Sequence, residues 1–337
     1  MLRPFFIVNP QSAGGSTGTR WRGEILPRAT ARFPAARWVL TRAPGQAAAL
    51  AARARAEGAS VLVAVGGDGT VHEVVNGLLG ERLGEAGAPL PESKGAAWAR
   101  DFSPRADGEP PVVGLVPMGT GCDLAKTLGI PRNVEGALDI LASGRSIVAD
   151  VCEIACVSAG GAPVRRFSIN TCGCGLSGEV AARVNGAGWP RHGLLAFLIA
   201  TLRGVVAYRP REVTIAIDGG PPVSTRLLAL FVCNGQYCGG GMRPGLGARP
   251  DDGVLRVVEV GAIGLPRVLA NIHRLYSGDV ETVRGVRVNN ARRIDVAPGA
   301  PGPVALVDCD GEQPGRLPAT YEVRPGALRV VAAFPLV

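Results

Sequence analysis

The sequence predicts two domains of different fold classes: an α/β domain on a parallel, Rossmann-like sheet, then an antiparallel, β-rich domain. In residues 1–146, strand-like apolar runs alternate with helix-like stretches, which is typical of a parallel sheet covered by helices. From residue 147 onward, β-branched runs follow one another between turns, and few helices interrupt them. The chain of 337 residues is long enough for both domains to bury a core.

The first half shows the order strand, helix, strand, helix, strand, helix. The predicted strands are residues 5–8, 36–40, 61–65 and 112–116, and the predicted helices are residues 19–32, 46–57, 71–78 and 133–143. Ligands of such sheets bind at the carboxyl ends of the strands, where Asn9, Thr41 and Gly66 stand. Residues 80–111 lack this periodicity, so we expect a mobile surface insertion or lid there, or a plain disordered loop.

The stretch around Gly66 is the strongest functional signal of this half. The apolar run Val61–Val65 leads into Gly66-Gly67-Asp68-Gly69-Thr70, and Thr70 and Glu73 have the spacing of a helix capping box. Backbone N–H groups and the positive end of a helix dipole would then face the space above the loop, which favours a phosphate. The carboxylate of Asp68 would repel a phosphate unless it holds a cation or accepts a proton. The loop therefore predicts Mg²⁺ and phosphoryl transfer.

A second glycine-rich turn, Gly119-Thr120-Gly121, follows the strand predicted at residues 112–116. Its Thr120 hydroxyl and its N–H groups could face the same phosphates as the first loop. Two such turns after neighbouring parallel strands are more specific than one.

The second half is predicted to be mostly strands. The expected strands are residues 148–157, 164–171, 212–217, 226–233, 254–260, 286–296, 304–308 and 327–333, with helices at 177–184, 190–207 and 265–276. Residues 147–322 form the expected second domain, and the strand within 323–337 could return to the first. Gly173–Gly178 has the Gly-x-Gly-x-x-Gly form of a dinucleotide site, but it lies in the β-rich half. Close packing of a strand against a helix explains its glycines more simply.

The charge distribution indicates which half could meet an anionic partner. The formal net charge is +8, and residues 151–337 hold 20 basic and 14 acidic side chains, against 16 and 14 in residues 1–150. The second half is therefore the candidate for a membrane or lipid surface, with a plain solvated surface as the alternative. Nucleic acid is disfavoured, because the basic residues are scattered and aromatic residues make up only 5% of the chain.

Cysteine usage and the N-terminus indicate a cytoplasmic protein. The eight cysteines form no Cys-x-x-Cys pair and the three histidines are isolated, which disfavours zinc and favours buried, reduced thiols. The chain begins without a basic leader and cleavage signal, so no secretory peptide is expected. The longest strongly apolar run, Leu194–Leu202, is too short to span a bilayer, so any membrane contact is expected to be peripheral.

Three polar stretches of the second half could carry chemistry. Asp310-Gly311-Glu312 follows an apolar run and would present two carboxylates, although Asp-Gly also forms an ordinary turn. Asp251 and Asp252 are adjacent in another turn and could hold a hard cation. Residues 189–198 combine an aromatic, a basic pair and an apolar face, which suits a membrane interface or a buried helix.

Taken in order, these stretches resemble the diacylglycerol kinase-like lipid kinases in their bacterial soluble form, within the ATP-NAD kinase and phosphofructokinase-like superfamily. The resemblance runs along most of the chain. It rests on Asn9–Gly14, on Gly66–Thr70 with Glu73, Asn76 and Gly77, on Gly119–Gly121 with Asp123, on Gly239–Met242 with Asp251–Gly253, and on Asp310–Glu312. The first glycine loop is shared with NAD kinases, whereas the later motifs select the lipid kinases.

The resemblance implies an ATP- and Mg²⁺-dependent kinase that phosphorylates the hydroxyl of a lipid such as diacylglycerol at a membrane surface. The implied ATP contacts are Thr41, Gly66, Gly67, Asp68, Gly69, Thr70, Val71, His72 and Thr120, and Asn9 is a further candidate. Glu312 would be the general base that takes the proton from the lipid hydroxyl. Asp310 and Asp68 would organise Mg²⁺ and water, and a structural Mg²⁺ would lie at the side chain of Asp252 and the carbonyls of Arg249 and Val254.

Two features depart from the family pattern. Cys122 stands where the family usually has asparagine, which removes an amide that could orient the second glycine turn, and the 80–111 insertion is longer than usual. The departure at Cys122 motivates a non-catalytic lipid- or nucleotide-binding regulator as an alternative of another class. An NAD kinase, which shares the first glycine loop, is the alternative of the same class. The lipid and the oligomeric state stay open.

Overall fold

The computed structural model describes residues 3–80, 111–185, 204 and 206–333, and its chain forms two compact units. Unit 1 comprises Met1–Ala149 and Gly326–Val337, and unit 2 comprises Asp150–Pro325. Strands β5 (Ser146–Val157) and β14 (Glu312–Val331) each contain a point at which the chain passes from one unit to the other.

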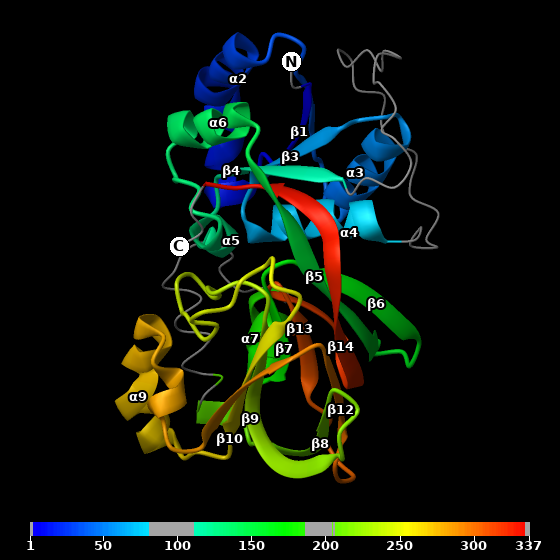
Figure 1. Cartoon of the computed structure of the whole chain (residues 1–337), viewed down its shortest axis with the longest axis vertical. Helices are drawn as coiled ribbons and strands as arrows, with labels where there is room; N and C mark the ends of the chain where they lie inside the picture. Colours follow the sequence, from blue (N-terminus) through cyan, green and yellow to red (C-terminus); the bar gives the residue numbers. More distant parts are fainter. Residues whose placement is uncertain (1–2, 81–110, 186–203, 205, 334–337) are drawn as a thin grey trace. The chain divides into compact units, whose positions relative to one another are not determined.

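Unit 1 is built on a parallel sheet, as predicted (Figure 1). Its strand order is β2-β1-β3-β4-β14, and every neighbouring pair in it is parallel. The strands are β1 (Pro4–Val8), β2 (Arg37–Leu40), β3 (Val61–Gly66), β4 (Val112–Pro117) and the last residues of β14. All residues of β1 and β3 are buried, because helices cover both faces of such a sheet.

The helices of unit 1 lie close to their predicted positions. They are α1 (Ser16–Arg20), α2 (Leu26–Arg32), α3 (Gln46–Ala56), α4 (Asp68–Leu79), α5 (Asp123–Thr127) and α6 (Val134–Ser143), with a π-helical turn at Trp21–Ile25 between α1 and α2. Phe6 of β1 packs against Trp21, with ring centroids 5.6 Å apart, and against Phe33 at 6.4 Å. These aromatic contacts belong to a core that also contains residues of β3, β4 and α6.

The capping box predicted at Thr70 and Glu73 is wrong. Helix α4 begins at Asp68, so Thr70 lies within its first turn. The carboxylate of Glu73 instead accepts hydrogen bonds from the backbone N–H groups of Gly45 and Ala47, both at 2.9 Å, and so caps the start of α3. The spacing was right for a capping box, but the N–H groups that need an acceptor belong to the neighbouring helix.

Unit 2 is antiparallel and rich in strands, as predicted. Its strands are β5, β6 (Pro163–Ser168), β7 (Thr171–Gly175), β8 (Arg211–Ile217), β9 (Val223–Cys233), β10 (Leu255–Gly261), β11 (Val286–Ala291), β12 (Arg293–Pro298), β13 (Leu306–Cys309) and β14. The pairings β8-β9-β7-β13-β14-β12-β8 close into a ring, so these six strands form a barrel. The pair β10–β11 extends from β9, and β5–β6 extends from β14. Closure removes the unpaired edges that an open sheet would expose.

Two predicted strands are each broken into two. The strand expected at 164–171 becomes β6 and β7, because the N–H groups of Ile169 and Asn170 donate to the side chain of Asp310 instead of to a strand. The strand expected at 286–296 becomes β11 and β12, because the N–H groups of Arg292 and Arg293 both donate to Asp218 Oδ1 at 2.8 Å. In both places a distant carboxylate interrupts the ladder.

The glycines of the Gly-x-Gly-x-x-Gly motif serve close packing, as the sequence indicated. Gly173 lies within β7, where a side chain would overlap the carbonyl oxygen of Leu230 in the paired strand β9. Gly178 lies in α7 (Leu176–Asn185), where a side chain would overlap the carbonyl oxygen of Leu306 in β13.

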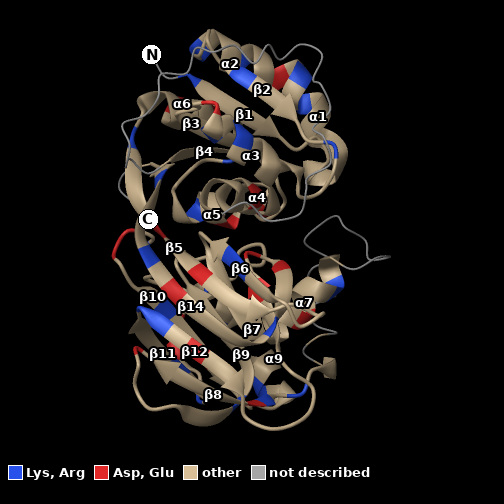
Figure 2. Cartoon of the chain, turned by 90° about the vertical axis from the view of Figure 1, so that its right-hand side faces the viewer, with Lys and Arg blue, Asp and Glu red and all other residues tan. Residues whose placement is uncertain are grey.

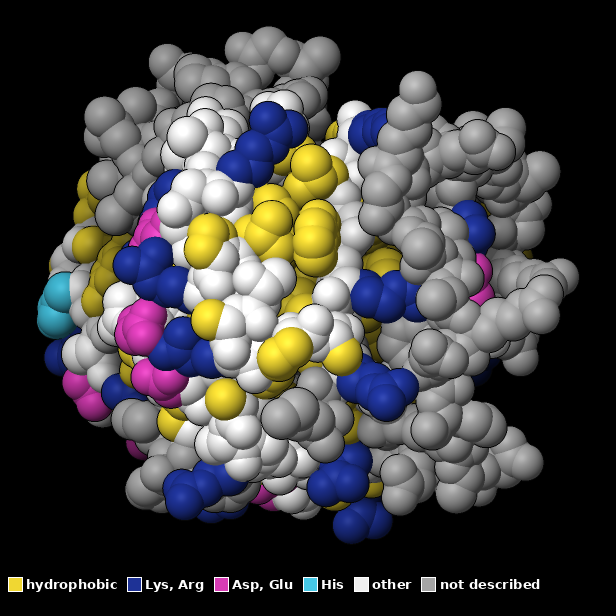
Figure 3. Space-filling view, turned by 90° about the horizontal axis from the view of Figure 1, so that it is seen from above, with side chains coloured by type: hydrophobic (Ala, Val, Ile, Leu, Met, Phe, Trp, Pro, Cys, Tyr) yellow, Lys and Arg dark blue, Asp and Glu magenta, His cyan; other side chains and the backbone are white. Residues whose placement is uncertain are grey.

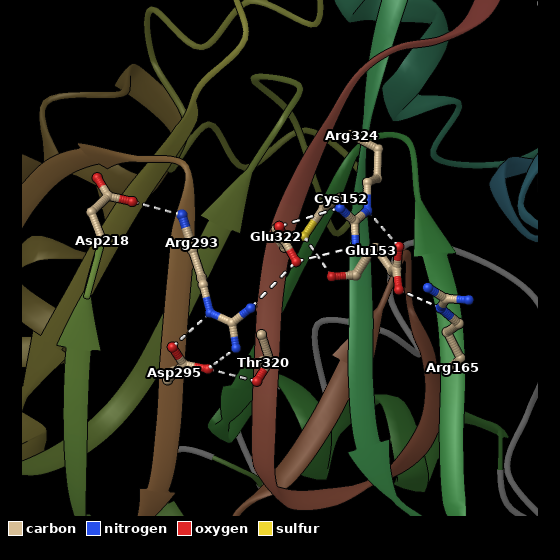
Figure 4. Close-up of polar contacts among 9 residues, drawn as sticks. All are labelled: Cys152, Glu153, Arg165, Asp218, Arg293, Asp295, Thr320, Glu322 and Arg324. Atoms are coloured by element: carbon tan, nitrogen blue, oxygen red, sulfur yellow. Dashed lines mark hydrogen bonds and ion pairs between the residues drawn. The ribbon is translucent and has the colours of Figure 1, made fainter.

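The outward faces of β5, β12 and β14 carry a network of ion pairs (Figure 4), and Figure 2 shows the basic and acidic positions in this part of unit 2. Glu153 accepts from Arg165 and, at 2.6 Å, from Arg324. Arg293 pairs with Asp295 at 2.9 Å and with Glu322 at 3.4 Å.

A groove of about 410 Å³ beside the network is lined mainly by small side chains. Asp295, the only charged residue among its described lining residues, is already paired, so the groove is a poor candidate for an active site.

Some hydrophobic side chains reach the surface. Figure 3 shows one face on which hydrophobic side chains gather between arginine or lysine side chains. None of the helices in the described part of the chain has the length and apolar character needed to cross a bilayer.

Three predicted segments lie outside the described residues. They are the 80–111 insertion apart from Gly80 and Pro111, nearly all of the predicted helix 190–207, and the 189–198 stretch.

Candidate functional site

The two glycine-rich turns of unit 1 lie against each other. Gly67 precedes α4, and Gly119 follows β4, which pairs with β3 along its whole length. A Cβ atom at Gly119 would lie 2.5 Å from the Cα of Gly67, closer than real Cβ atoms approach another backbone. The two backbones can touch only because both residues are glycines. The sequence prediction of two neighbouring turns is therefore confirmed.

The ends of the neighbouring strands surround the first loop. Asn9, which follows β1, donates its side-chain amide to the hydroxyl of Thr70 at 3.2 Å. Thr41, which follows β2, is buried and donates its N–H to the carbonyl of Val8 at 2.8 Å. The carboxyl ends of three parallel strands thus place these predicted nucleotide contacts along one edge of the sheet.

Asp68 links the first loop to the second turn. It is the first residue of α4, and its carboxylate accepts from the N–H of Leu124 at 3.3 Å. Leu124 lies in the first turn of α5, so the carboxylate also stands near that helix N-terminus. Because α4 has 12 residues and its first N–H groups have no acceptor within the helix, its start suits an anion.

Cys122 performs a structural task in the second turn. It adopts a left-handed conformation, with φ of 49°, which asparagine tolerates better than other non-glycine residues. Its thiol donates to the carbonyl of Gly119 at 3.1 Å, and Arg132 donates to the same carbonyl at 2.8 Å. Burial, followed by the negative charge of Asp68, raises the pKa of the thiol to about 11, so the donor keeps its proton at neutral pH.

The remaining predicted nucleotide contacts differ in exposure. Thr120 is exposed at the tip of its turn, and Gly69 is partly exposed. Val71 and His72 are buried on α4, where the side-chain amide of Asn76 donates to the carbonyl of His72 at 2.9 Å. Thr120 and Gly69 are therefore more accessible than Val71 and His72.

Asp310 is the most heavily bonded residue of the predicted site in unit 2. Its carboxylate accepts from the Ser168 hydroxyl at 2.7 Å and from the N–H groups of Ile169, Asn170 and Thr171 at 3.2, 3.1 and 3.1 Å. Its own N–H donates to the carbonyl of Thr171 at 3.0 Å. Asp310 thus holds the connection between β6 and β7 against the end of β13.

Glu312 is presented by a tight hairpin turn. Cys309 and Glu312 pair across β13 and β14, so Asp310 and Gly311 form a two-residue loop with positive φ values of 51° and 88°. A type I′ hairpin requires such a pair of angles, and Asp-Gly is well suited to it. Asp310-Gly311-Glu312 is therefore an ordinary turn that also exposes the Glu312 carboxylate, so the two interpretations of this motif are compatible.

Asn185 orients Glu312 and was not identified from the sequence. It ends α7, and its side-chain amide donates to Glu312 Oε2 at 3.1 Å and to the carbonyl of Gly311 at 2.9 Å. A single asparagine at a helix end carries no local signal that a turn more than a hundred residues away needs it.

The predicted structural metal site contains an acidic residue that the sequence analysis missed. Asp252 accepts from the N–H of Val254 at 3.1 Å, and buried Asp150 accepts from the N–H of Gly253 at 2.7 Å. Burial, opposed by the Val254 hydrogen bond and assisted by the charges of Asp150 and Asp251, raises the pKa of the Asp252 carboxyl. Carboxylates that repel one another in a turn are oxygen donors of the kind that Mg²⁺ binds, so the donor set fits the ion.

Comparison with known proteins gives a consistent relationship along the chain. Residues 3–154 match the model of the diacylglycerol kinase catalytic domain, and residues 170–332 match that of the YegS C-terminal NAD kinase beta sandwich-like domain. A diacylglycerol kinase of Mycobacterium tuberculosis is 25% identical over 283 residues, which are 84% of this chain and 80% of the relative. A diacylglycerol kinase of Staphylococcus aureus is 27% identical over 278 residues, covering 82% and 76%.

Solved structures share the fold. A diacylglycerol kinase structure from Bacillus anthracis superposes with a TM-score of 0.65 at 20% identity, over 99% of this chain and 98% of the other. The complex of yeast NADH kinase with NADH superposes with a TM-score of 0.51 at 12% identity, over 99% and 84%. At these identities the likeness concerns the fold alone.

Proposed function

The chain belongs to the diacylglycerol kinase-like lipid kinase family, and from this premise we propose that it uses ATP and Mg²⁺ to phosphorylate the hydroxyl of a lipid such as diacylglycerol. The observation that carries the proposal is the exposed carboxylate of Glu312, which a rigid hairpin turn presents and Asn185 orients. We assign residues 1–146 to the nucleotide and residues 147–322 to the lipid substrate.

The proposed nucleotide site uses backbone groups more than side chains. The N–H groups from Gly67 to Gly69 at the start of α4 would bind the phosphates, with Thr120 beside them on the touching turn. Asn9, Thr41 and Thr70 would line the edge of this site. Holding the phosphates in one orientation is most of what a protein contributes to phosphoryl transfer.

Glu312 is the proposed general base. It would accept the proton of the lipid hydroxyl as the oxygen attacks the γ-phosphate of ATP. The hydrogen bond from Asn185 to Oε2 would hold the carboxylate in position. Asp310 would fix the turn from which Glu312 works.

Two Mg²⁺ roles belong to the proposal. At the catalytic site Asp68 and Asp310 would organise the ion and its water, and the ion would offset the charge of the phosphates. At the structural site the Asp252 carboxylate and the carbonyls of Arg249 and Val254 would hold the ion. The nearby carboxylate of Asp150, which accepts from the N–H of Gly253 at 2.7 Å, supports this second assignment.

The variant Glu312→Gln tests the base, because glutamine keeps the shape and the acceptor for Asn185 but cannot take the proton. We expect the rate of lipid phosphorylation to fall by about 10²–10⁴-fold, while the dissociation constant for ATP stays unchanged. The matched control is Asp308→Asn in the same hairpin, where the Asp308 carboxylate accepts from the N–H of Gly311 at 2.9 Å. Wild-type rates for Glu312→Gln on its best lipid would show that the base assignment is wrong.

The fold likeness to an NADH kinase supports one rival, the phosphorylation of a dinucleotide. Labelled ATP incubated separately with NAD, with NADH and with a panel of lipid alcohols separates the two activities. Transfer to the dinucleotides with none to any lipid would replace the lipid kinase proposal.

A further inference from the structure

We propose that helix α9 (Leu265–Ser277) is the surface by which unit 2 docks on an anionic lipid bilayer (Figure 1). This inference rests on the proposed function, because a kinase whose substrate lies in a bilayer must work at the bilayer surface. It adds the part of the molecule that makes the contact and the charge of the lipids it contacts.

The sequence of α9 divides the helix into an apolar and a polar side. Leu265, Val268, Leu269, Ile272, Leu275 and Tyr276 recur at spacings of three and four residues, so they share one side of a helix. The opposite side carries Arg267, Asn271 and Arg274. This division is typical of a helix that lies in the plane of a membrane interface.

Within the part of the chain that the structure describes, the apolar side of α9 is not buried. No side chain of the helix is buried, and Leu265, Leu269 and Tyr276 are 37%, 48% and 46% exposed. Helix α6 provides the contrast, because it is shorter and amphipathic and yet buries Val134, Ala137, Leu138 and Leu141. The apolar stripe of α9 therefore has hydrophobic area available for another surface.

The charges on α9 are all of one sign. The helix has two arginines and one histidine, His273, and it has no acidic residue along its 13 residues. Of the acidic groups that follow it, Glu281 is paired with Arg256 at 3.1 Å, and Asp279 accepts from the Ser277 hydroxyl at 2.7 Å. A basic amphipathic helix is attracted to anionic headgroups while its apolar side enters the acyl boundary.

The helix is already held in the orientation that exposes this side. The carbonyl of Leu275 accepts from the N–H of Arg243, and the guanidinium of Arg274 donates to the hydroxyl of Thr282. Docking would thus need little ordering of the helix, which lowers the entropic cost of binding.

A second copy of the chain is a weaker occupant for the same face. A stable dimer buries roughly 800 Å² on each partner, and three half-exposed side chains on one helix supply only part of that area. A bilayer needs no such matched area, since binding strength grows with each inserted side chain and each basic residue.

Vesicle co-sedimentation without ATP tests the proposal. The full chain is mixed with vesicles of phosphatidylcholine alone or with phosphatidylglycerol added, at low and high NaCl. We expect binding to the mixed vesicles that weakens with salt. Leu269→Glu should lower the partition coefficient about tenfold or more through lost apolar contact, and Arg267→Glu about fivefold or more through lost attraction.

Matched variants elsewhere control for the added charge. Val223→Glu changes a side chain of unit 2 that is 51% exposed, and Arg22→Glu changes an exposed arginine of unit 1. Both should bind vesicles like the wild type. Melting temperature and the phosphorylation rate of a water-soluble short-chain lipid should match the wild type for every variant, which shows that the fold is intact.

Two results would overturn the inference. One is vesicle binding by Leu269→Glu equal to that of the wild type. The other is a wild-type dimer that Leu269→Glu converts to a monomer while vesicle binding is unaltered, which would make α9 a subunit contact. Failure of the proposed function would look different, because no lipid would then be phosphorylated even though the vesicle results held.

Discussion

Replacing Asp310 by alanine should destabilise unit 2 far more than an ordinary turn substitution. The carboxylate accepts four hydrogen bonds, from the Ser168 hydroxyl and from the N–H groups of Ile169, Asn170 and Thr171. Alanine would leave those donors without this acceptor. It would also have to adopt a φ of 51°, a left-handed conformation that disfavours a Cβ atom.

The magnitude follows from these contacts. A hydrogen bond to a charged group contributes about 1.5–3 kcal/mol, but four bonds to one partly buried carboxylate do not add in full. With about 1 kcal/mol for the left-handed conformation, we expect Asp310→Ala to lower the free energy of unfolding by about 4–6 kcal/mol. That is a large part of the 5–15 kcal/mol that typically stabilises a domain. Asp310→Asn keeps one acceptor and tolerates the turn, so its loss should be about half as large.

Urea unfolding and amide hydrogen exchange measure the effect. The N–H groups of residues 169–171 should exchange faster in Asp310→Ala, and the unfolding midpoint should fall. Asp308→Ala in the same hairpin removes the acceptor of the Gly311 N–H and should cost less, about 1 kcal/mol for that hydrogen bond. Equal losses for the two variants would refute the reasoning. Full stability of Asp310→Ala with lost phosphorylation would instead show that the carboxylate acts directly on Mg²⁺ or water.

Further predictions concern the glycine turns and the surface network. Gly119→Ala would place a Cβ atom 2.5 Å from the Cα of Gly67, so calorimetry should show that the affinity for ATP falls roughly tenfold or more. Gly23→Ala is the control, because a Cβ atom there meets no atom within 4 Å, and it should leave the affinity for ATP unchanged. Burial raises the pKa of the Cys122 thiol to about 11, so mass spectrometry should find the thiol unlabelled by iodoacetamide in the folded protein at pH 8. The contribution of the protonated thiol to stability should be lost as the pH rises from about 9 toward 11. Cys122→Asn should raise the kinase rate if the family's amide is what this turn lacks, whereas an inactive wild type and an inactive variant would favour the regulator. Burial raises the pKa of the Glu153 carboxyl, but hydrogen bonds from its two arginine partners outweigh burial and lower the pKa below the ordinary 4.5. The stability that the ionised carboxylate contributes above pH 4.5 should therefore be lost as the pH falls through the pKa of the folded state. Glu153→Gln should make the melting temperature depend less on pH in this acidic range.

The sequence by itself determined the fold classes and the first glycine-rich element. Buried strands such as Val61–Val65 are marked by continuous apolar residues, and a turn such as Gly66–Thr70 by glycines that few other residues can replace. These are local properties, so the order of strands and helices in unit 1 could be predicted without a structure. The catalytic and metal-binding roles of individual residues stay predictions.

Only the tertiary structure decided which polar groups act together. Glu73 caps a helix that begins 27 residues before it. Asp310 breaks the strand predicted at residues 164–171, although it lies 142 residues after Ser168 of that strand. Asn185 and Asp150 joined their sites through similarly distant contacts. Which acceptor an N–H group meets depends on which distant segments the fold brings together. The spacing of residues along the chain does not determine that arrangement. The ring of six strands in unit 2 has the same origin, since closure depends on which strands pair and not on their individual sequences.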